Sequence, residues 1–243
     1  MKKKGLLFIL SVALIFSLQL SPIVNAQQAQ PQQAEKSEFT EATRPEENYL
    51  ARFHALERVE YLMKSNIDKI YMLKIIVTNY KDQGWEKDYE ACYNGYKKGM
   101  DYYYKRDVIY AQVELEKNRK DIYELYKKIA DVYKQRTQAL LNECASKILD
   151  LSLDERSKSN PDRNKVLFNN TARLRIAYGQ YDDGQNMMDD HVYDTAVKHF
   201  RVAKSYAILI LEDIDPENAK GKYDLDKADN MNRILNQPQT QAK

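Results

Sequence analysis

The 243-residue chain has few of the residues that interrupt helices, with only seven glycines and six prolines. Charged residues make up 30% of it, and lysine, glutamate, leucine and alanine are frequent, a composition typical of helical proteins. The sequence also lacks a Ser/His/Asp set, a glycine-rich loop for phosphate and a paired-cysteine metal motif. These absences leave no candidate catalytic residue, so we expect a protein that is not an enzyme and carries no cofactor.

The N-terminus has the three parts of a secretory signal peptide. Lys2 to Lys4 form a basic segment, Leu6 to Leu18 an apolar core, and Val24 to Ala26 a cleavage site of small residues. The apolar run is shorter than the roughly 20 residues that span a membrane. We therefore expect cleavage of residues 1–26, export to the periplasm, and no membrane insertion of the mature chain; an uncleaved anchor is the alternative.

Removal of the signal changes the net charge of the chain. It takes away three lysines and no acidic residue, so the 38 basic residues become 35 against 36 acidic ones, and the charge falls from +2 to −1. A nearly neutral mature chain gives no reason to expect a nucleic acid or an anionic membrane surface as a partner.

Three regions follow the signal. Residues 27–45 are rich in glutamine, proline and glutamate, and we expect a disordered arm there. Residues 46–235 carry the helical pattern, and residues 236–243 form a polar tail that we also expect to be disordered.

Pro45 suits the first turn of the first helix, and Gly84 suits the left-handed backbone that ends it. The short connection predicts antiparallel packing with the next helix.

Residues 85–153 carry the longest periodic pattern. Apolar or small residues recur at steps of three, four or seven, the period of one helix face, and no proline interrupts them. Asp107 could cap a new helix after Lys105 and Arg106, but the apolar register does not slip there. We therefore predict one continuous helix, about 100 Å long at a rise of about 1.5 Å per residue. The expected fold is all-α: an elongated antiparallel helical bundle built on this central helix.

Start and stop signals divide the rest of the helical region. Asn160 followed by proline predicts a helix start with an asparagine cap. Gly179 and Gly184 predict an end or a kink of that helix, and Asp190 is the expected cap of the next one. Asp215, also followed by proline, predicts the start of a last helix.

The two cysteines, Cys92 and Cys144, are 52 residues apart. On one continuous helix that separation is about 78 Å, whereas a disulfide needs Cα atoms within about 7 Å. Both lie on the apolar stripe, so we predict two buried free thiols. A bond between them would instead indicate that the long helix is broken into a hairpin.

Two segments share a spacing of aromatic and small residues, in the order aromatic, small, aromatic, small. The spacing resembles the second helix of a tetratricopeptide repeat, although chance amphipathic similarity is the alternative. It predicts helix-hairpin packing in which the small residues let a neighbour approach, and we expect the first helix to dock at Cys92 and Gly99. The helix-docking residues are Tyr89, Cys92, Tyr96 and Gly99 in one segment and Tyr193, Ala196, Phe200 and Ala203 in the other.

Tyrosine is abundant, with 19 residues against one tryptophan. Its ring packs while its hydroxyl stays in water, which suits half-buried helix faces; the alternative is an interaction surface. Tyr102, Tyr103, Lys105 and Arg106 combine rings with positive charge. Because consecutive residues on a helix point in different directions, some of them must face water or a partner. These four form the candidate interaction surface.

Neither the histidines nor the acidic residues have the spacing of metal ligands. His191 and His199 are eight residues apart, and His54 stands alone. The acidic stretch from Asp182 to Asp194 lacks the alternating oxygens and the later glutamate of a calcium loop. We expect surface and capping roles for these residues, and no metal.

One resemblance covers most of the mature chain. A signal without a lipidated cysteine, a Gln/Pro/Glu-rich arm and a long Tyr/Lys/Glu-rich helix, seen at Tyr96 to Arg106 and Leu115 to Ile122, resemble the spirochaete flagellar-coiling proteins. The resemblance lies in organisation and includes no diagnostic motif. It implies an all-helical sheath component of the periplasmic flagellar filament that helps to shape it for motility. It also implies other filament or sheath proteins, and further copies of the chain, as partners, and no catalytic residues.

Two further functions remain alternatives at this point. A periplasmic tetratricopeptide-like adaptor would bind a protein or peptide in a helical groove, and an enzyme or ligand-binding protein would use an aromatic cleft. A structural, non-enzymatic role is the function that we expect.

Overall fold

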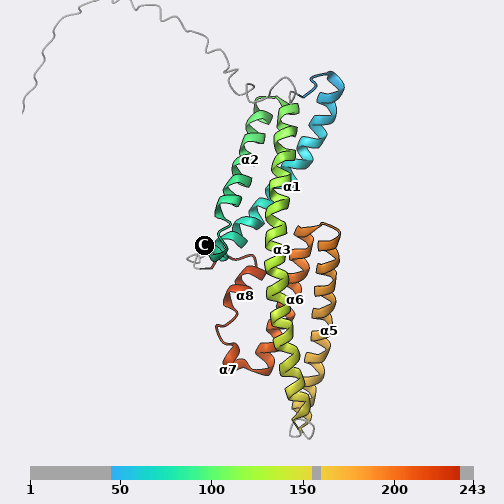
Figure 1. Cartoon of the computed structure of the whole chain (residues 1–243), viewed down its shortest axis with the longest axis vertical. Coiled ribbons are helices and arrows are strands. Elements are labelled where there is room, and N and C mark those ends of the chain that lie inside the picture. Colours follow the sequence, from blue (N-terminus) through green and yellow to red (C-terminus); the bar gives the residue numbers. More distant parts are fainter. Residues whose placement is uncertain (1–44, 155–159, 236–243) are drawn as a thin grey trace, which may run out of the picture. The chain divides into compact units, whose positions relative to one another are not determined.

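The computed structural model describes residues 45–154 and 160–235, which belong to one packed unit. Every regular element in these residues is helical, so the predicted all-α bundle is confirmed (Figure 1). The signal, arm and tail predicted for residues 1–44 and 236–243 lie outside the described residues. In chain order the elements are α1 (Tyr49–Asn79), the 3₁₀ turn η2 (Lys81–Gln83), α2 (Glu86–Tyr104), α3 (Val108–Leu153), α5 (Pro161–Asp189), α6 (Tyr193–Ile214), α7 (Pro216–Ala219) and α8 (Asp224–Asn230).

Helix α1 begins at an asparagine cap. The Asn48 side chain accepts a hydrogen bond from the Ala51 N–H at 2.7 Å, so Pro45 precedes the cap and does not occupy the first turn as predicted. After α1 and η2, Gly84 has a φ of 68°, which confirms the predicted left-handed position. Helix α2 then runs back beside α1, antiparallel to it (Figure 1).

The prediction of one helix over residues 85–153 is wrong, because α2 and α3 are separate helices. Between them Arg106 has a φ of 64°. The N–H groups of Arg106 and Asp107 donate to the carbonyls of Tyr103 and Tyr102, at 2.9 and 3.0 Å. This pair of bonds is a Schellman motif, which usually has glycine at its left-handed position. Since arginine occupies that position here, the sequence shows no helix stop.

Helix α2 folds back along α3 and packs closely against it. A Cβ placed on Gly99 would lie 2.6 Å from Cγ of Leu115. The Asn118 amide donates to the Cys92 carbonyl at 2.6 Å and accepts from Asn66 of α1 at 3.0 Å. The expected docking of α1 at Cys92 and Gly99 is therefore wrong, since α3 occupies that face. Helices α1, α2 and the first half of α3 form the N-terminal bundle.

The second half of α3 packs against the hairpin of α5 and α6, and these helices form the C-terminal bundle. The Asn160 side chain accepts from the Asp162 N–H at 3.0 Å, with Pro161 at the first helical position, so the predicted start is confirmed. Helix α5 continues through Gly179 and Gly184. Neither glycine ends the helix, so that part of the prediction is wrong.

The turn between α5 and α6 repeats the construction of the turn between α2 and α3. His191 has a φ of 61°. The N–H groups of His191 and Val192 donate to the carbonyls of Met188 and Met187, at 3.0 and 2.8 Å. Asp190 therefore ends α5, and the prediction that it caps α6 is wrong.

The C-terminal segment, residues 215–235, contacts both bundles. Asp215 caps α7, which begins at Pro216, so the predicted start is confirmed, although two short helices stand where one was expected. The segment then reaches the end of α1. There the Asn79 amide donates to the Arg233 carbonyl at 2.9 Å, and the Leu235 N–H donates to the Asn79 side chain at 2.9 Å.

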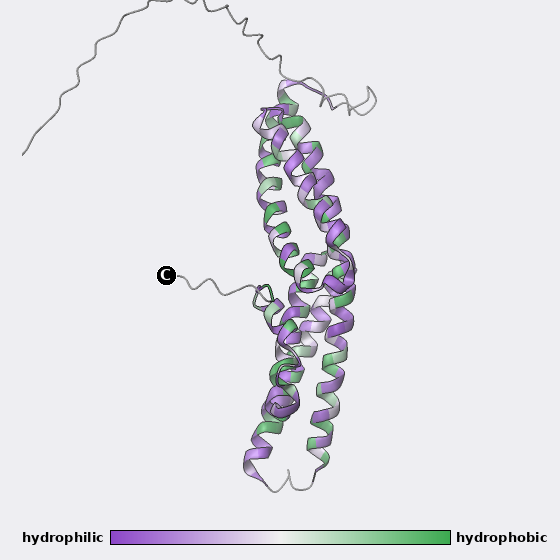
Figure 2. Cartoon of the chain, turned by 90° about the vertical axis from the view of Figure 1, so that its left-hand side faces the viewer, coloured by the Kyte–Doolittle hydropathy of each residue, from purple (hydrophilic) through white to green (hydrophobic). Residues whose placement is uncertain are grey.

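Hydrophilic and hydrophobic residues alternate along the helices (Figure 2). The buried hydrophobic residues form a core to which α3 contributes from Ile122 to Ile148. Both cysteines are free and buried, which confirms the predicted thiols. The reason differs from the one expected, because α2 and α3 do form a hairpin. Cys92 lies in the N-terminal bundle beside Asn118, whereas Cys144 lies in the C-terminal bundle, with its Sγ 3.2 Å from the Ala207 carbonyl oxygen.

Candidate interaction site

A cluster of exposed apolar side chains lies where the start of α1 meets the turn between α2 and α3. Tyr49, Phe53, Leu56 and Tyr104 are 86%, 54%, 42% and 74% exposed. They surround an open hollow of about 690 Å³. We call this surface the tip, and its residues are Tyr49, Arg52, Phe53, Leu56, Tyr103, Tyr104, Arg106 and Val108.

The tip is held by contacts between α1 and the turn. The Arg52 guanidinium donates to the Arg106 carbonyl at 3.4 Å. Just before α1, the Glu47 carboxylate accepts from the Tyr110 hydroxyl at 2.5 Å. These two contacts connect the start of α1 to the Schellman turn and to α3, so the backbone segments that carry the exposed rings are joined.

The candidate interaction surface predicted from the sequence is partly at the tip. Tyr103 and Arg106 line its hollow, and Lys105 is exposed beside them. Tyr102 is not a surface residue, because it is 3% exposed and its ring stacks on Tyr110 with centroids 5.7 Å apart. The aromatic residues of α1 were not predicted to belong to this surface, because about 50 positions separate them from the tyrosine run.

The chemistry of the tip suits a protein partner. Exposed contiguous apolar surface marks interaction sites, and aromatic residues and arginine are enriched at the centres of protein interfaces. The tip presents both, with two arginines among tyrosine, phenylalanine and leucine side chains.

The first set of predicted docking residues lies on the side of α2 that faces the rest of the bundle. Cys92 and Gly99 are buried, and Tyr89 and Tyr96 are half-buried against the core. Tyr89 also stacks on Tyr93, with centroids 6.3 Å apart. This set therefore works as helix-packing residues.

The second set is fully interior: Tyr193, Ala196, Phe200 and Ala203 are all buried in α6. A Cβ on Gly184 of α5 would lie 2.6 Å from the Phe200 ring, so a glycine opposite an aromatic ring lets the two helices approach. Hairpin packing is thus present, but the two sets are not equivalent. In the first set Gly99 faces Leu115 of α3, the helix that follows. In the second, Phe200 faces Gly184 of α5, the helix that precedes, whereas Tyr193 meets Tyr123 of α3.

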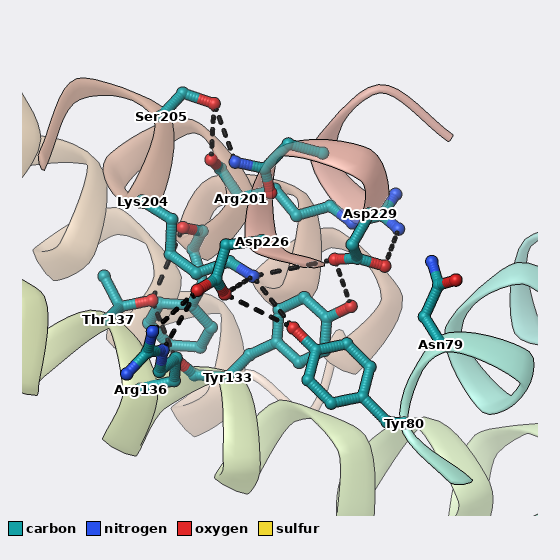
Figure 3. A network of polar contacts seen from close by, with 12 residues as sticks. Asn79, Tyr80, Tyr133, Arg136, Thr137, Arg201, Lys204, Ser205, Asp226 and Asp229 are labelled. Carbon is teal, nitrogen blue, oxygen red and sulfur yellow. Dashed lines mark hydrogen bonds and ion pairs between the residues drawn. The ribbon is translucent and has the colours of Figure 1, made fainter. Parts of the chain in front are cut away.

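A buried cluster of charges lies where the two bundles meet (Figure 3). Lys204 and Asp229 are 0% exposed. The Lys204 ammonium lies 3.0 Å from the Asp226 carboxylate, 3.6 Å from that of Asp229, and 4.5 Å from the centroid of the Tyr133 ring. It also donates to the Tyr80 hydroxyl at 3.3 Å. We call this cluster the joint, and its residues are Tyr80, Tyr133, Arg136, Arg201, Lys204, Asp226 and Asp229.

The joint connects α3, α6 and α8, together with Tyr80 just after α1, through two carboxylates that both come from α8. Asp229 accepts from Arg201 of α6 at 2.9 Å and from the hydroxyl of Tyr133 of α3 at 2.6 Å. Asp226 accepts from Arg136 of α3 at 2.8 Å. Charges this deeply buried persist only when they are paired and hydrogen-bonded, and here every carboxylate has a cation beside it.

Burial and charge shift the pKa values of these groups in opposite directions. Burial opposes ionisation of Asp226, but Lys204 and Arg136 outweigh it and lower the pKa of that carboxyl. Burial, followed by the charge of Asp229, raises the pKa of the Tyr133 hydroxyl well above its ordinary value. The joint therefore holds an ionised Asp226 between two cations and a neutral Tyr133 hydroxyl.

The histidines have ordinary surroundings. His54 is exposed, His191 Nδ1 is 3.2 Å from the Tyr193 hydroxyl, and His199 Nδ1 is 3.1 Å from the Gln180 side chain. In the part of the chain that the structure describes, no group of three or more His, Cys, Asp or Glu residues could hold a metal ion.

Among the described helices, none combines the length and the apolar composition that crossing a membrane requires. Comparisons with models of protein families, with curated proteins and with solved structures find no match to this chain.

Proposed function

We propose that this chain is a structural, non-enzymatic protein of the bacterial periplasm that assembles with other proteins through its tip. The observation that carries the proposal is the exposure of Tyr49, Phe53 and Tyr104 on one surface. A partner that covered these rings would remove apolar area from water, which stabilises a complex by about 25 cal/mol per Å² before the costs of association.

The assembly that we propose is the sheath of a periplasmic flagellar filament, in which the chain helps to shape the filament for motility. The resemblance to flagellar-coiling proteins supports this setting. A fixed bundle with an apolar surface at one place suits a subunit that must bind in a defined orientation. Copies joined by repeated heterologous contacts would extend along a filament without closing.

Co-purification tests the proposal. In a spirochaete host, the wild-type chain should sediment with isolated periplasmic flagella, and deletion of its gene should straighten the filaments or impair swimming. A chain found entirely in the soluble periplasmic fraction, together with normal filaments in the deletion strain, would contradict the proposal.

A variant of the tip tests whether the chain can lose its binding to filaments while it keeps its fold. Tyr49→Ser/Phe53→Ser/Tyr104→Ser should keep the helical circular dichroism spectrum and remain in the supernatant. The matched control is Tyr71→Ser/Phe168→Ser, which removes two rings that are 64% and 75% exposed outside the tip. The control should sediment like the wild type.

A further inference from the structure

A second surface, separate from the tip, lies in a trough between α1 and α3. The two helices run in the same direction here, since Arg58 pairs with Glu116, and Lys69, further along α1, accepts through its carbonyl from Tyr126, further along α3. Two hollows, of about 610 and 340 Å³, follow one another along the trough and share Lys120 in their linings.

The trough lies on the same face of α3 that α6 packs against further along the helix. Several residues of α3 share one heptad position. Of these, Ile109 and Glu116 line the trough, and Thr137 and Cys144 contact α6. Tyr123 has the same heptad position and lies between them, where its ring meets that of Tyr193 at the start of α6, with centroids 5.0 Å apart. Residues seven apart lie on one face of a helix. On the first half of α3 this face is only partly covered: Tyr123 is 37% exposed, whereas Ile109 is buried and Glu116 is paired with Arg58 of α1.

The floor of the trough is aromatic and already ordered. Tyr126 donates through its hydroxyl to the Lys69 carbonyl at 3.2 Å, and Tyr123 is fixed edge-to-face against Tyr193. Tyr61 lies at the rim, 59% exposed. Rings held by their own neighbours lose little freedom when a partner covers them, which favours binding.

The rim of the trough carries more positive than negative charge. Its cations are Lys69, Lys117, Arg119 and Lys120, and its carboxylates are Glu46, Glu116 and Asp194. Asp194 is engaged by Lys69 at 3.3 Å, and Glu116 is shared by two arginines. Lys117 and Lys120 form no ion pair within the described ranges. An acidic partner would complement these lysines, whereas a basic one would be repelled.

We propose that the trough binds an acidic amphipathic helix of a partner protein, with its apolar side on the tyrosines and its carboxylates beside Lys117 and Lys120. From Ile109 to Tyr126 the trough is about 26 Å long at about 1.5 Å per residue, enough for about five helical turns. The site adds a second contact to the proposed function and does not depend on the tip.

The test uses the full mature chain and a defined probe. The probe is a fluorescein-labelled helical peptide of Glu, Leu and Phe, with apolar residues at every third and fourth position, and its counterpart has Lys in place of each Glu. Fluorescence anisotropy should show the acidic peptide binding at least about tenfold more tightly than the basic one. Equal binding of the two peptides, or no binding of the acidic one, would overturn the proposal.

Variants locate the bound peptide. Lys117→Glu/Lys120→Glu should weaken binding at least about tenfold, and Tyr61→Ala by a similar factor. Lys87→Glu/Lys165→Glu reverses the same number of charges on α2 and α5, and should leave binding within about twofold of the wild type. Rim variants that bind as tightly as the control would contradict the assignment of the site.

Other occupants give different outcomes. Self-association that the Lys117→Glu/Lys120→Glu variant abolishes would identify a second copy as the occupant and overturn the partner-helix proposal. Binding to phosphatidylglycerol vesicles without binding to the peptide would also overturn it. Failure at the tip is distinguishable, because tip variants should keep peptide binding and trough variants should keep sedimentation with filaments.

Discussion

The two ends of α1 differ in the side chains that they expose and bury. Apolar rings, usually buried, are exposed at one end, and charged groups, usually exposed, are buried at the other. At its start, Tyr49 and Phe53 expose apolar rings to water. Just beyond its end, Tyr80 meets the buried side chains of Lys204 and Asp226. The tip is thus apolar and exposed, whereas the joint is charged and buried.

The joint acts in the folding of the chain, and the tip is available for assembly with a partner. Buried charges are stable only with all their partners present, so the joint must form whenever the chain is folded. Exposed rings contribute little to the stability of the free chain, and they stabilise a complex only when a partner covers them. The joint therefore fixes how α1, α3, α6 and α8 meet, and the tip is left for another molecule.

The largest expected effect is at the joint. Asp229→Ala removes the carboxylate that pairs with Arg201 and leaves Lys204 with Asp226 alone, so the free energy of unfolding should fall by about 3–5 kcal/mol. Urea unfolding followed by circular dichroism measures the change. Asp224→Ala is the control, because this acidic residue of α8 is exposed, and it should cost less than about 1 kcal/mol. Equal losses in the two variants would show that burial of charge does not hold the joint.

An intermediate effect is expected where α5 meets α6. Gly184→Ala would place a Cβ 2.6 Å from the Phe200 ring, and the overpacking should cost about 1–3 kcal/mol. Gly179→Ala lies in the same helix with no atom within 4 Å of the added Cβ. It should gain about 0.5–1 kcal/mol, because alanine favours helix more than glycine does. Thermal unfolding of both variants checks the opposite signs, and a Gly184→Ala variant as stable as Gly179→Ala would refute the close approach.

A smaller effect is expected at the turn that carries the tip. Arg106→Gly removes a side chain from left-handed backbone at φ 64°, and it also makes the unfolded chain more flexible. The net gain in the free energy of unfolding should be about 0.5–1 kcal/mol. A large loss of stability would mean that the Arg106 side chain, and not only its backbone, holds the turn.

The smallest effect at neutral pH concerns the two thiols, one in each bundle. Burial raises the pKa of Cys92 and Cys144 from the ordinary 9 to about 12. Because the folded pKa lies above the unfolded one, the thiols should leave stability unchanged below pH 9 and lower it as pH rises from 9 towards 12. Ellman's reagent at pH 8 should react with both thiols only on unfolding. A fast reaction of one thiol in the folded chain would show that its bundle opens separately.

The sequence predicted those features that local chemistry determines. Gly84 and Asn160 stand where a left-handed residue and a helix cap are required, and both were identified from their residue types. The helical class followed from the periodic apolar pattern. The turn at Arg106 was missed because its left-handed residue is not glycine and because the apolar register continues across it. The start of a new helix near Asp190 was predicted, but the end of α5 was expected at Gly179 or Gly184 because the left-handed residue, His191, is not glycine.

The candidate sites were predicted less completely than the fold. The tyrosine run located one side of the tip, but Tyr49 and Phe53 reach it only through tertiary packing. The joint was missed because Lys204 looks like any charged residue of an amphipathic helix, and its carboxylate partners on α8 are more than 20 positions away. Pairing across helices, unlike capping within one, leaves no short-range pattern in the sequence.

Hydrogen exchange of the wild-type chain, with and without isolated periplasmic filaments, tests the central claim most directly. If a partner covers the tip, amides in residues 49–56 and 103–108 should exchange more slowly in the presence of filaments. Amides in residues 226–230, at the joint, should be unchanged because the joint is already formed in the free chain. Unchanged exchange at the tip, with protection gained at the joint, would contradict the account.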